Sequence, residues 1–216
     1  MPLTLVIDTA AGRCAAALFD GERALGVHDE PLAKGHAERL FPMIGECLAS
    51  AGRGYAEIGL IAVCTGPGNF TGARIGVAAA RGLALSTGAA AVGVDRFEAL
   101  ADGRDGVVCV ALSGRGGALH LARFEDGAPT REAETLQPEA GAAFAEGALV
   151  IGGGAAALGA ALGAIRIGDM TDDAPLVAFA RVAARKALSG APRPAPRYLR
   201  PANAAPARGA APQILP

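Results

Sequence analysis

The stretch Gly66-Pro67-Gly68-Asn69-Phe70-Thr71-Gly72-Ala73-Arg74-Ile75-Gly76 decides how this chain folds, because it connects an apolar strand predicted from Leu60 to Cys64 with a helix of small residues. A strand that turns through glycines into a helix aims backbone N–H groups at one point, as phosphate-binding turns do. The proline has no N–H to donate, however, and the Gly-Lys-Ser/Thr ending of a P-loop is missing. The helix is more informative, since Gly72, Gly76 and Ala80 recur every four residues and form one stripe that another backbone can approach closely.

Length and composition predict two compact lobes. The chain has 216 residues, of which 51% are hydrophobic and 4% are aromatic, and it lacks Trp. A chain of this length lies between one large domain and two small ones. Its core must be filled by Ala, Val, Leu and Ile, which favours closely packed elements.

The order of the predicted elements repeats after about residue 103. The first set comprises strands at Leu3–Asp8, Arg13–Asp20 and Arg23–Glu30, a helix at Gly35–Ser50, the strand and helix of the glycine-rich stretch, a strand at Ala90–Val94 and a short helix with a capping-box start at Asp95. The second set comprises strands at Gly106–Ser113, Gly117–Glu125 and Thr130–Leu136, a helix at Pro138–Glu146, a strand at Ala148–Ile151 and an alanine-rich helix after Gly152-Gly153-Gly154. We therefore predict an α/β fold with a first lobe at 1–103, a second at 104–190 and an extended tail at 191–216 rich in Pro, Ala and Arg. Each lobe opens with a three-stranded antiparallel meander.

The C-terminal part is basic. No Asp or Glu follows Ala174, whereas seven cationic residues do: Arg181, Arg185, Lys186, Arg193, Arg197, Arg200 and Arg208. A helix starting near Pro175, capped by Asp172 or Asp173, is expected to close the second lobe, and Tyr198 with Leu199 should anchor the tail. The basic end suits RNA or an acidic partner. The alternative is a solvated helix face and tail.

The sequence shows no set of residues with the spacing of a catalytic centre. A helical His-x-x-x-His pair would place two metal ligands on one face, but the residue four after His36 is Leu40. Asp8 is expected to order its own turn and Asp95 to cap a helix, and the cysteines read as small core residues. No catalytic residue, metal ligand or cofactor of this chain is therefore assigned, although the triple glycine leaves open the approach of a phosphate. No stretch is long and apolar enough for a membrane helix, which together with the cysteine usage predicts a cytoplasmic protein.

Two helices of the first lobe carry the most informative surface. We predict that they bind a partner through Leu40, Phe41, Ile44, Leu48, Phe70, Gly72, Ala73, Arg74, Gly76 and Ala80, beside the glycine-rich turn of Gly66, Pro67, Gly68, Asn69 and Thr71. On this reading, Ile44→Arg or a bulky residue at Gly76 abolishes pairing while the lobes stay folded. The alternative is that Ile44 and Gly76 face the lobe's own sheet.

The residues resemble a known family. Val6-Ile7-Asp8-Thr9-Ala10, the stretch from Gly66 to Gly76 with Gly82-Leu83-Ala84, and Pro196-Arg197-Tyr198-Leu199-Arg200 are similar to the TsaB family of bacterial threonylcarbamoyladenosine-biosynthesis subunits, which is glycoprotease-like. Leu112-Ser113-Gly114-Arg115 departs from the family pattern of acidic and basic residues.

The resemblance implies two ribonuclease-H-like lobes of the actin-like ATPase (ASKHA) fold. It further implies a non-catalytic scaffold or dimerisation subunit that pairs with the catalytic paralogue TsaD, or with a second copy of itself, through the two first-lobe helices. The ATPase TsaE is a further implied partner, ATP and metal are implied for the partner subunits, and tRNA is the substrate of the complex. Two other readings remain open: a stand-alone kinase-like ATPase or glycoprotease-like hydrolase, and an RNA-binding module that uses the basic C-terminal segment.

Overall fold

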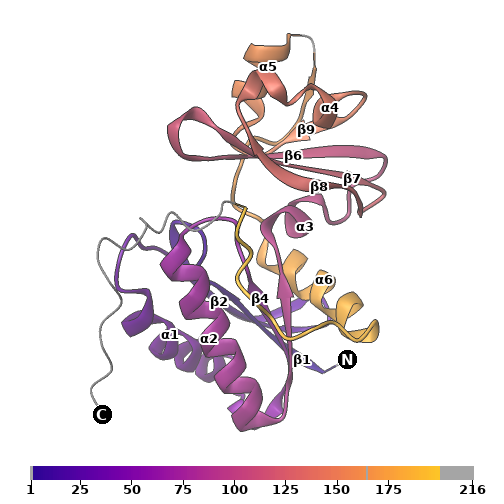
Figure 1. Ribbon diagram of the computed structural model, residues 1–216. Helices are drawn as coiled ribbons and strands as arrows, with labels where there is room; N and C mark the ends of the chain where they lie inside the picture. The colour runs from indigo at the N-terminus through magenta and orange to yellow at the C-terminus, as the bar shows by residue number, and fades with distance from the viewer. Residues whose placement is uncertain (1, 164, 200–216) are drawn as a thin grey trace, which may run out of the picture.

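The computed structural model describes residues 2–163 and 165–199, and these form two sheets with helices around them (Figure 1). In the first sheet, the strand order is β3-β2-β1-β4-β5, with β1 (Leu3–Asp8), β2 (Arg13–Asp20), β3 (Arg23–Pro31), β4 (Ile58–Cys64) and β5 (Ala90–Val94). β1 pairs with β2 antiparallel and with β4 parallel, so its carboxyl end meets the start of the glycine-rich turn. The meander expected at the start of the chain is confirmed.

The second sheet repeats this plan. Its strand order is β10-β9-β6-β7-β8, with β6 (Val107–Ser113), β7 (Leu119–Glu125), β8 (Ala128–Leu136), β9 (Leu149–Ile151) and β10 (Arg166–Ile167). The two-residue turn between β7 and β8 has positive φ at both Asp126 and Gly127, the conformation that Asp-Gly favours in a hairpin. The duplicated order of elements confirms the predicted α/β fold of two similar lobes.

Helices cover both faces of the first sheet. α1 (His36–Ser50) and α2 (Phe70–Thr87) cover one face, where Leu5, Ile7 and Ile61 meet Leu40 and Ile44 in a buried cluster. The other face is covered by α6 (Leu176–Leu188), which contacts β4, β5 and β1 and lies beside α3 (Arg96–Ala101) (Figure 1). The two sides of the sheet therefore have separate cores.

The position of α6 corrects a prediction. We expected this helix to close the second lobe, but its main strand contacts are with the first sheet, and its Phe179 is fully buried in one cluster with Val92 and Val94. Sequence periodicity shows which face of a helix is apolar, and it leaves open which sheet receives that face. The chain thus crosses to the second lobe and returns, so that the first lobe contains elements from both ends of the described sequence.

The second lobe's helices are short. The segment expected as one helix from Pro138 to Glu146 divides into η3 (Pro138–Ala140) and α4 (Ala142–Ala145), and α5 (Ala155–Leu162) follows the triple glycine. Short 3-10 segments also occur at η1 (Tyr55–Glu57) and η2 (Arg115–Gly117). A buried cluster around Phe144, Leu121 and Leu158 fills one side of the second sheet. Its other side, including Val110 and Phe124, continues into the core beneath α6, so one of the hydrophobic clusters spans both lobes.

No helix among the described residues is long and apolar enough to span a membrane.

Candidate functional site

The glycine-rich turn connects β4 with the start of α2 and packs against the residues that follow β1. The side chain of Asn69 accepts hydrogen bonds from the N–H groups of Thr71 and Gly72, both at 3.1 Å, and so caps α2. The turn presses against the backbone at Thr9 and Ala10, because a Cβ at Gly72 would lie 1.8 Å from the Thr9 carbonyl oxygen and one at Gly68 would lie 2.0 Å from that of Ala10. These glycines are needed for close backbone packing within the lobe.

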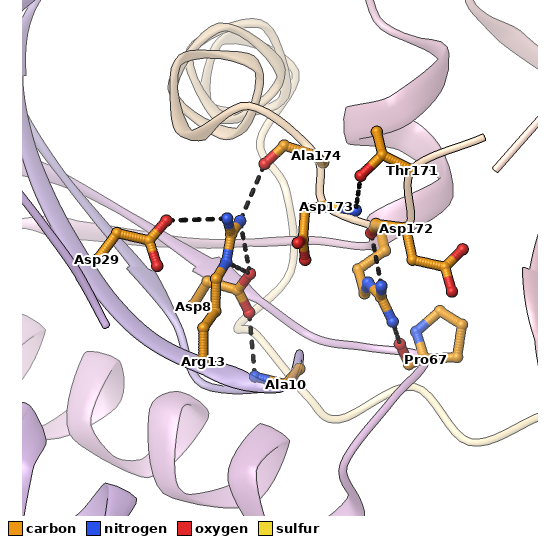
Figure 2. A network of polar contacts seen from close by, with 10 residues as sticks. Asp8, Ala10, Arg13, Asp29, Pro67, Thr171, Asp172, Asp173 and Ala174 are labelled. Carbon is orange, nitrogen blue, oxygen red and sulfur yellow. Dashed lines mark hydrogen bonds and ion pairs between the residues drawn. The ribbon is translucent and has the colours of Figure 1, made fainter. Parts of the chain in front are cut away.

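An ionic network at the junction of the lobes surrounds Asp8. The carboxylate of Asp8 accepts a hydrogen bond from the Ala10 N–H at 3.0 Å, which confirms that it orders its own turn, and it pairs with Arg13 at 3.1 Å. The same guanidinium reaches Asp29 and the carbonyl of Ala174, where the chain enters α6 (Figure 2). Desolvation of Arg13 opposes its charge, but the neighbouring carboxylates, Asp8 first, leave its pKa raised. Arg13 thus connects the first sheet with the segment that enters α6.

A second arginine joins the two glycine-containing turns. Arg96 is 9% exposed, and its guanidinium donates to the carbonyl oxygens of Pro67 and Asp172. In the second lobe, the N–H of Gly153 donates to the Asp172 carboxylate at 2.7 Å. Asp172 therefore does not cap α6 as expected, because the N-cap of that helix is Pro175 without a side-chain cap. The Asp172 carboxylate instead accepts a hydrogen bond from the triple-glycine turn.

The junction does not fit a nucleotide phosphate. The cations that would receive one, Arg13 and Arg96, already bond to carboxylates and carbonyls of this chain. At the triple glycine, the N–H groups of Gly152 and Gly154 donate to carbonyl oxygens, and that of Gly153 donates to the carboxylate of Asp172, which repels an anion.

The helix start at His36 does not fit a metal. The imidazole is 4% exposed and its Nε2 has no hydrogen-bond partner within residues 2–163 and 165–199. The position one turn further on is Leu40, which is fully buried in the core. Over the same residues, no group of three or more His, Cys, Asp or Glu side chains is arranged to hold a metal ion. A lone histidine in an apolar helix face gives too few ligands for a stable metal site.

The predicted partner surface needs correction. Seven of its residues are buried inside the lobe: Leu40, Ile44, Leu48, Gly72, Ala73, Gly76 and Ala80. Ile44 packs in the cluster with β1 and β4, and a Cβ at Gly76 would lie 2.6 Å from the Thr9 hydroxyl, so both face the lobe's own sheet. The stripe of small residues on the helix was identified correctly, but we predicted that it contacts a partner. Sequence alone does not show whether such a stripe packs on the lobe's own sheet or on a partner helix. Ile44→Arg would bury a charge and unfold the lobe.

The opposite sides of the two helices form what we call the outer face, defined by Phe41, Arg74, Ala78, Gly82 and Leu85. Phe41 is 48% exposed and Leu85 is 90% exposed, and nothing lies within 4 Å of a Cβ built at Gly82. Sequence reasoning found Phe41 and Arg74 but missed Ala78, Gly82 and Leu85. The available signal was that, starting from Arg74, they follow one another at steps of four, four and three residues along the helix. Four of its five residues are small or apolar although they are exposed, and Arg74 is its cation.

The C-terminal cations are mostly paired within the chain. Arg181 and Arg185 both pair with Asp102, whose side chain is 2% exposed, and Lys186 pairs with Glu98 at 2.8 Å. Arg197 pairs with Asp95, whose pKa is raised by burial and by the neighbouring Glu98, with Arg197 acting in the opposite direction. Arg193 is exposed, and Arg200 and Arg208 lie outside the described residues. Most of the positive charge between Arg181 and Arg197 is therefore paired with carboxylates of the chain itself.

The four cysteines are buried and free, as expected for core residues. Burial raises the pKa of the Cys14 thiol to about 11 and that of Cys109 to about 12. Such thiols are poor nucleophiles at neutral pH.

The extended C-terminal segment is anchored as predicted. Its Arg197 N–H donates to the Thr65 carbonyl at 2.8 Å, the Tyr198 hydroxyl accepts a hydrogen bond from Arg74, and Leu199 packs on the shared core. The segment Pro196-Arg197-Tyr198 thus lies beside the glycine-rich turn, so two of the motifs that carried the family resemblance meet in space.

Comparisons with known proteins agree with this architecture. The profile of the family described as TsaD, tRNA N6-adenosine threonylcarbamoyltransferase, matches residues 20–158. The chain is 33% identical over 126 residues to the tRNA threonylcarbamoyladenosine biosynthesis protein TsaB of Escherichia coli, covering 56% of this chain and 54% of that protein. It is 32% identical over 163 residues to a tRNA N6-adenosine threonylcarbamoyltransferase of Solidesulfovibrio magneticus, covering 66% of this chain and 44% of that protein.

A solved structure shares the fold. The crystal structure of a Pseudomonas aeruginosa protein with similarity to peptidase YeaZ superposes with a TM-score of 0.77 at 24% identity, over 93% of this chain and 100% of that one. The alignments span about half of the length of the curated relatives. The two lobes are thus of the ribonuclease-H-like, actin-like ATPase type, and the chain belongs to the TsaD family of tRNA threonylcarbamoyladenosine proteins, in which it is similar to TsaB.

Proposed function

We propose that this chain is a non-catalytic subunit of a complex that forms threonylcarbamoyladenosine on tRNA. In this role it pairs with a catalytic TsaD-type paralogue through the outer face and activates it. The ATPase TsaE is a further partner, and tRNA is the substrate of the whole complex. Without the paralogue, a second copy of this chain occupies the same face.

The observation that carries this proposal is the exposure of Leu85. A leucine that is 90% exposed lies on a helix whose neighbouring outward positions are Ala78 and Gly82, so a second helix can approach the backbone closely. Phe41 on α1 is 48% exposed, so each of the two helices, which contact each other, exposes a large apolar side chain. Pairing of two such helices with a partner's equivalent pair buries on the order of 1,000–2,000 Å², which is enough for a stable complex.

The bonds at the lobe junction favour a scaffold over an enzyme acting alone. Arg13 and Arg96 are engaged by groups of this chain, and Asp172 fills the triple-glycine turn. His36 is the lone histidine of its helix, and its helical neighbour Leu40 is a core residue. A catalytic role would require these groups to exchange their partners before a ligand could bind.

The test compares two equally exposed leucines. Leu85→Glu places a charge on the outer face, whereas Leu188→Glu does the same at the end of α6, where the native leucine is 91% exposed. Each purified variant is mixed with the TsaD protein of the same organism and analysed by size-exclusion chromatography with light scattering. We expect Leu85→Glu to abolish the complex and Leu188→Glu to leave it intact, with matching circular dichroism spectra. A complex that survives Leu85→Glu contradicts the proposed face.

The role in modification is tested in cells. Replacing the gene with one encoding the Leu85→Glu variant should reduce threonylcarbamoyladenosine in tRNA to the level of a deletion strain, as measured by mass spectrometry of nucleosides. Full modification in the deletion strain contradicts the proposal. Turnover of ATP or cleavage of a substrate by the isolated chain would instead favour the stand-alone kinase-like ATPase or glycoprotease-like hydrolase.

The RNA-binding alternative gives a different result. It requires the isolated chain to bind tRNA with a strong salt dependence that Arg193→Ala and Arg197→Ala reduce. We expect weak binding, because Arg197 is paired with Asp95 and is held away from a phosphate.

A further inference from the structure

Three side chains at the edge of the outer face form what we call the arginine clamp: Phe70, Arg74 and Tyr198. The guanidinium carbon of Arg74 lies 3.7 Å from the centroid of the Phe70 ring and 5.5 Å from that of Tyr198. The two rings are 5.1 Å apart, and Arg74 Nε donates to the Tyr198 hydroxyl at 2.6 Å. Stacking and a hydrogen bond together hold the guanidinium plane in one orientation.

The terminal nitrogens of this guanidinium have no acceptor among the residues that the structure describes. Within residues 2–163 and 165–199, no carboxylate, carbonyl or hydroxyl accepts a hydrogen bond from Nη1 or Nη2 of Arg74, and the residue is exposed. Arg13, Arg39, Arg181 and Arg197, by contrast, each pair with a carboxylate of this chain. An immobilised guanidinium with free terminal donors is prepared for a bidentate contact with a planar anion.

The position of the clamp identifies the source of that anion. Arg74 is one helical turn before Ala78 and continues the row that leads through Gly82 to Leu85, so it borders the surface proposed to meet the partner. We propose that Arg74 binds a carboxylate side chain of the paired protein and is the main polar determinant of that interface. This inference rests on the proposed function and adds to it the residue and the chemistry of recognition.

The surroundings favour a protein carboxylate over a nucleic-acid phosphate. RNA binding needs several phosphate contacts, but the nearby Arg197 pairs with Asp95 and Arg81 donates to the Pro194 carbonyl. The rings are also engaged, because the guanidinium covers one face of Phe70 and leaves less of it for stacking of a base. A single fixed arginine beside a small-residue apolar surface is the composition of a protein interface hot spot.

The clamp also gives the C-terminal segment a role. Tyr198 lies 124 residues after Arg74 in sequence, and its hydroxyl accepts from Nε, which leaves Nη1 and Nη2 for another acceptor. Its segment is fastened separately, since Arg197 N–H donates to the Thr65 carbonyl and Pro194 accepts from Arg81. Tyr198 is thus a positioning residue for Arg74.

The experiment measures affinity for the TsaD protein of the same organism by surface plasmon resonance. We expect Arg74→Ala to weaken binding about 10- to 100-fold, mostly through faster dissociation. Arg74→Lys should not restore it, because an ammonium lacks the planar pair of donors. Tyr198→Phe, which keeps the ring and removes the hydroxyl, should weaken binding about 2- to 5-fold. Arg193→Ala, an exposed arginine of the same segment, is the matched control and should bind as the parent chain does.

The outcomes separate this inference from the proposed function. Loss of the complex in Leu85→Glu with unchanged affinity in Arg74→Ala overturns the inference and leaves the scaffold role standing. Unchanged affinity in both variants contradicts the proposed interface itself. Normal affinity for TsaD together with weakened tRNA binding in Arg74→Ala overturns the carboxylate assignment in favour of a phosphate. Full affinity in Arg74→Lys shows that charge alone suffices and overturns the bidentate contact.

Discussion

The two helical layers on the first sheet differ in the side chains that they expose on their outward sides. Beneath both layers the sheet is covered by apolar side chains, with Ile44 on one side and Phe179 on the other fully buried. The outward side of α6 carries Arg181, Arg185 and Lys186, and all three pair with acids of this chain. The outward side of α2 instead presents Ala78, Gly82 and Leu85 without such cover.

This difference shows which layer is complete within the chain. The α6 layer contributes to the shared core and its charges are satisfied, so it needs no further partner. The α1–α2 layer is also packed inside, but its outward side exposes Phe41, Ala78, Gly82 and Leu85 among charged residues such as Glu38 and Arg81. Since soluble proteins rarely expose such patches without a use, the asymmetry directs attention to the outer face.

The largest expected effect distinguishes the two sides of α2 itself. Gly72→Ala adds a Cβ that would lie 1.8 Å from the Thr9 carbonyl oxygen, so we expect it to lower the free energy of unfolding by about 3 kcal/mol or more. Urea denaturation followed by circular dichroism measures this. Gly82→Ala is the control in the same helix, where the added methyl group meets nothing within 4 Å. It should raise the free energy of unfolding by about 0.5–1 kcal/mol. Equal stability of the two variants would show that α2 does not pack on β1 as described.

The next effect tests the ion pairs of the α6 layer. Asp102 has a side chain that is 2% exposed and receives both Arg181 and Arg185. Asp102→Ala removes the shared acceptor, and we expect the free energy of unfolding to fall by about 2 kcal/mol. The single change Arg185→Ala, at a guanidinium whose side chain is 61% exposed, should cost less than about 1 kcal/mol. A larger loss for Arg185→Ala than for Asp102→Ala would contradict the buried carboxylate as the centre of this contact.

A pH-dependent effect tests how tightly the α1 side is closed. Burial raises the pKa of Cys14 to about 11 from an ordinary value of 9.0. Because the folded state favours the neutral thiol, the associated stability is fully present below about pH 9 and is lost as the pH rises toward 11. We expect the Cys14→Ala variant to lose less stability than the parent chain between these pH values, as followed by thermal unfolding. At pH 8, labelling of Cys14 with a thiol reagent should be about 100-fold slower than in the unfolded chain. Rapid labelling in the native protein would show that the core under α1 opens readily.

The smallest effect on stability belongs to the two exposed leucines. Leu85→Glu and Leu188→Glu each change a side chain that is at least 90% exposed, so each should alter the free energy of unfolding by less than about 0.5 kcal/mol. Their stabilities should agree while their pairing with TsaD differs. A marked loss of stability in the isolated Leu85→Glu protein at low concentration would mean that Leu85 contributes to folding of the monomer.

Local sequence signals determined the elements and their order. Apolar runs and the Asp20-Gly21 turn located β1, β2 and β3 within a residue, and the Asp95 capping box has both of its hydrogen bonds. These signals succeed because each depends on side chains and backbone groups a few residues apart. The repeat of the same order after residue 103 was sufficient to predict two similar lobes.

Only the tertiary structure decided where the faces of those elements point. The stripe of Gly72 and Gly76 was visible in the sequence, but the Thr9 backbone is the surface that it meets. The apolar side of α6 was equally visible, yet its destination is the first sheet. The arginine clamp joins Arg74 to Tyr198, which are far apart in sequence. Asp172, expected at the start of α6, instead accepts a hydrogen bond from the triple-glycine turn of the second lobe. The physical reason is that periodicity specifies which side of a helix avoids water, while competition among all apolar and charged surfaces of the folded chain selects the partner that covers it.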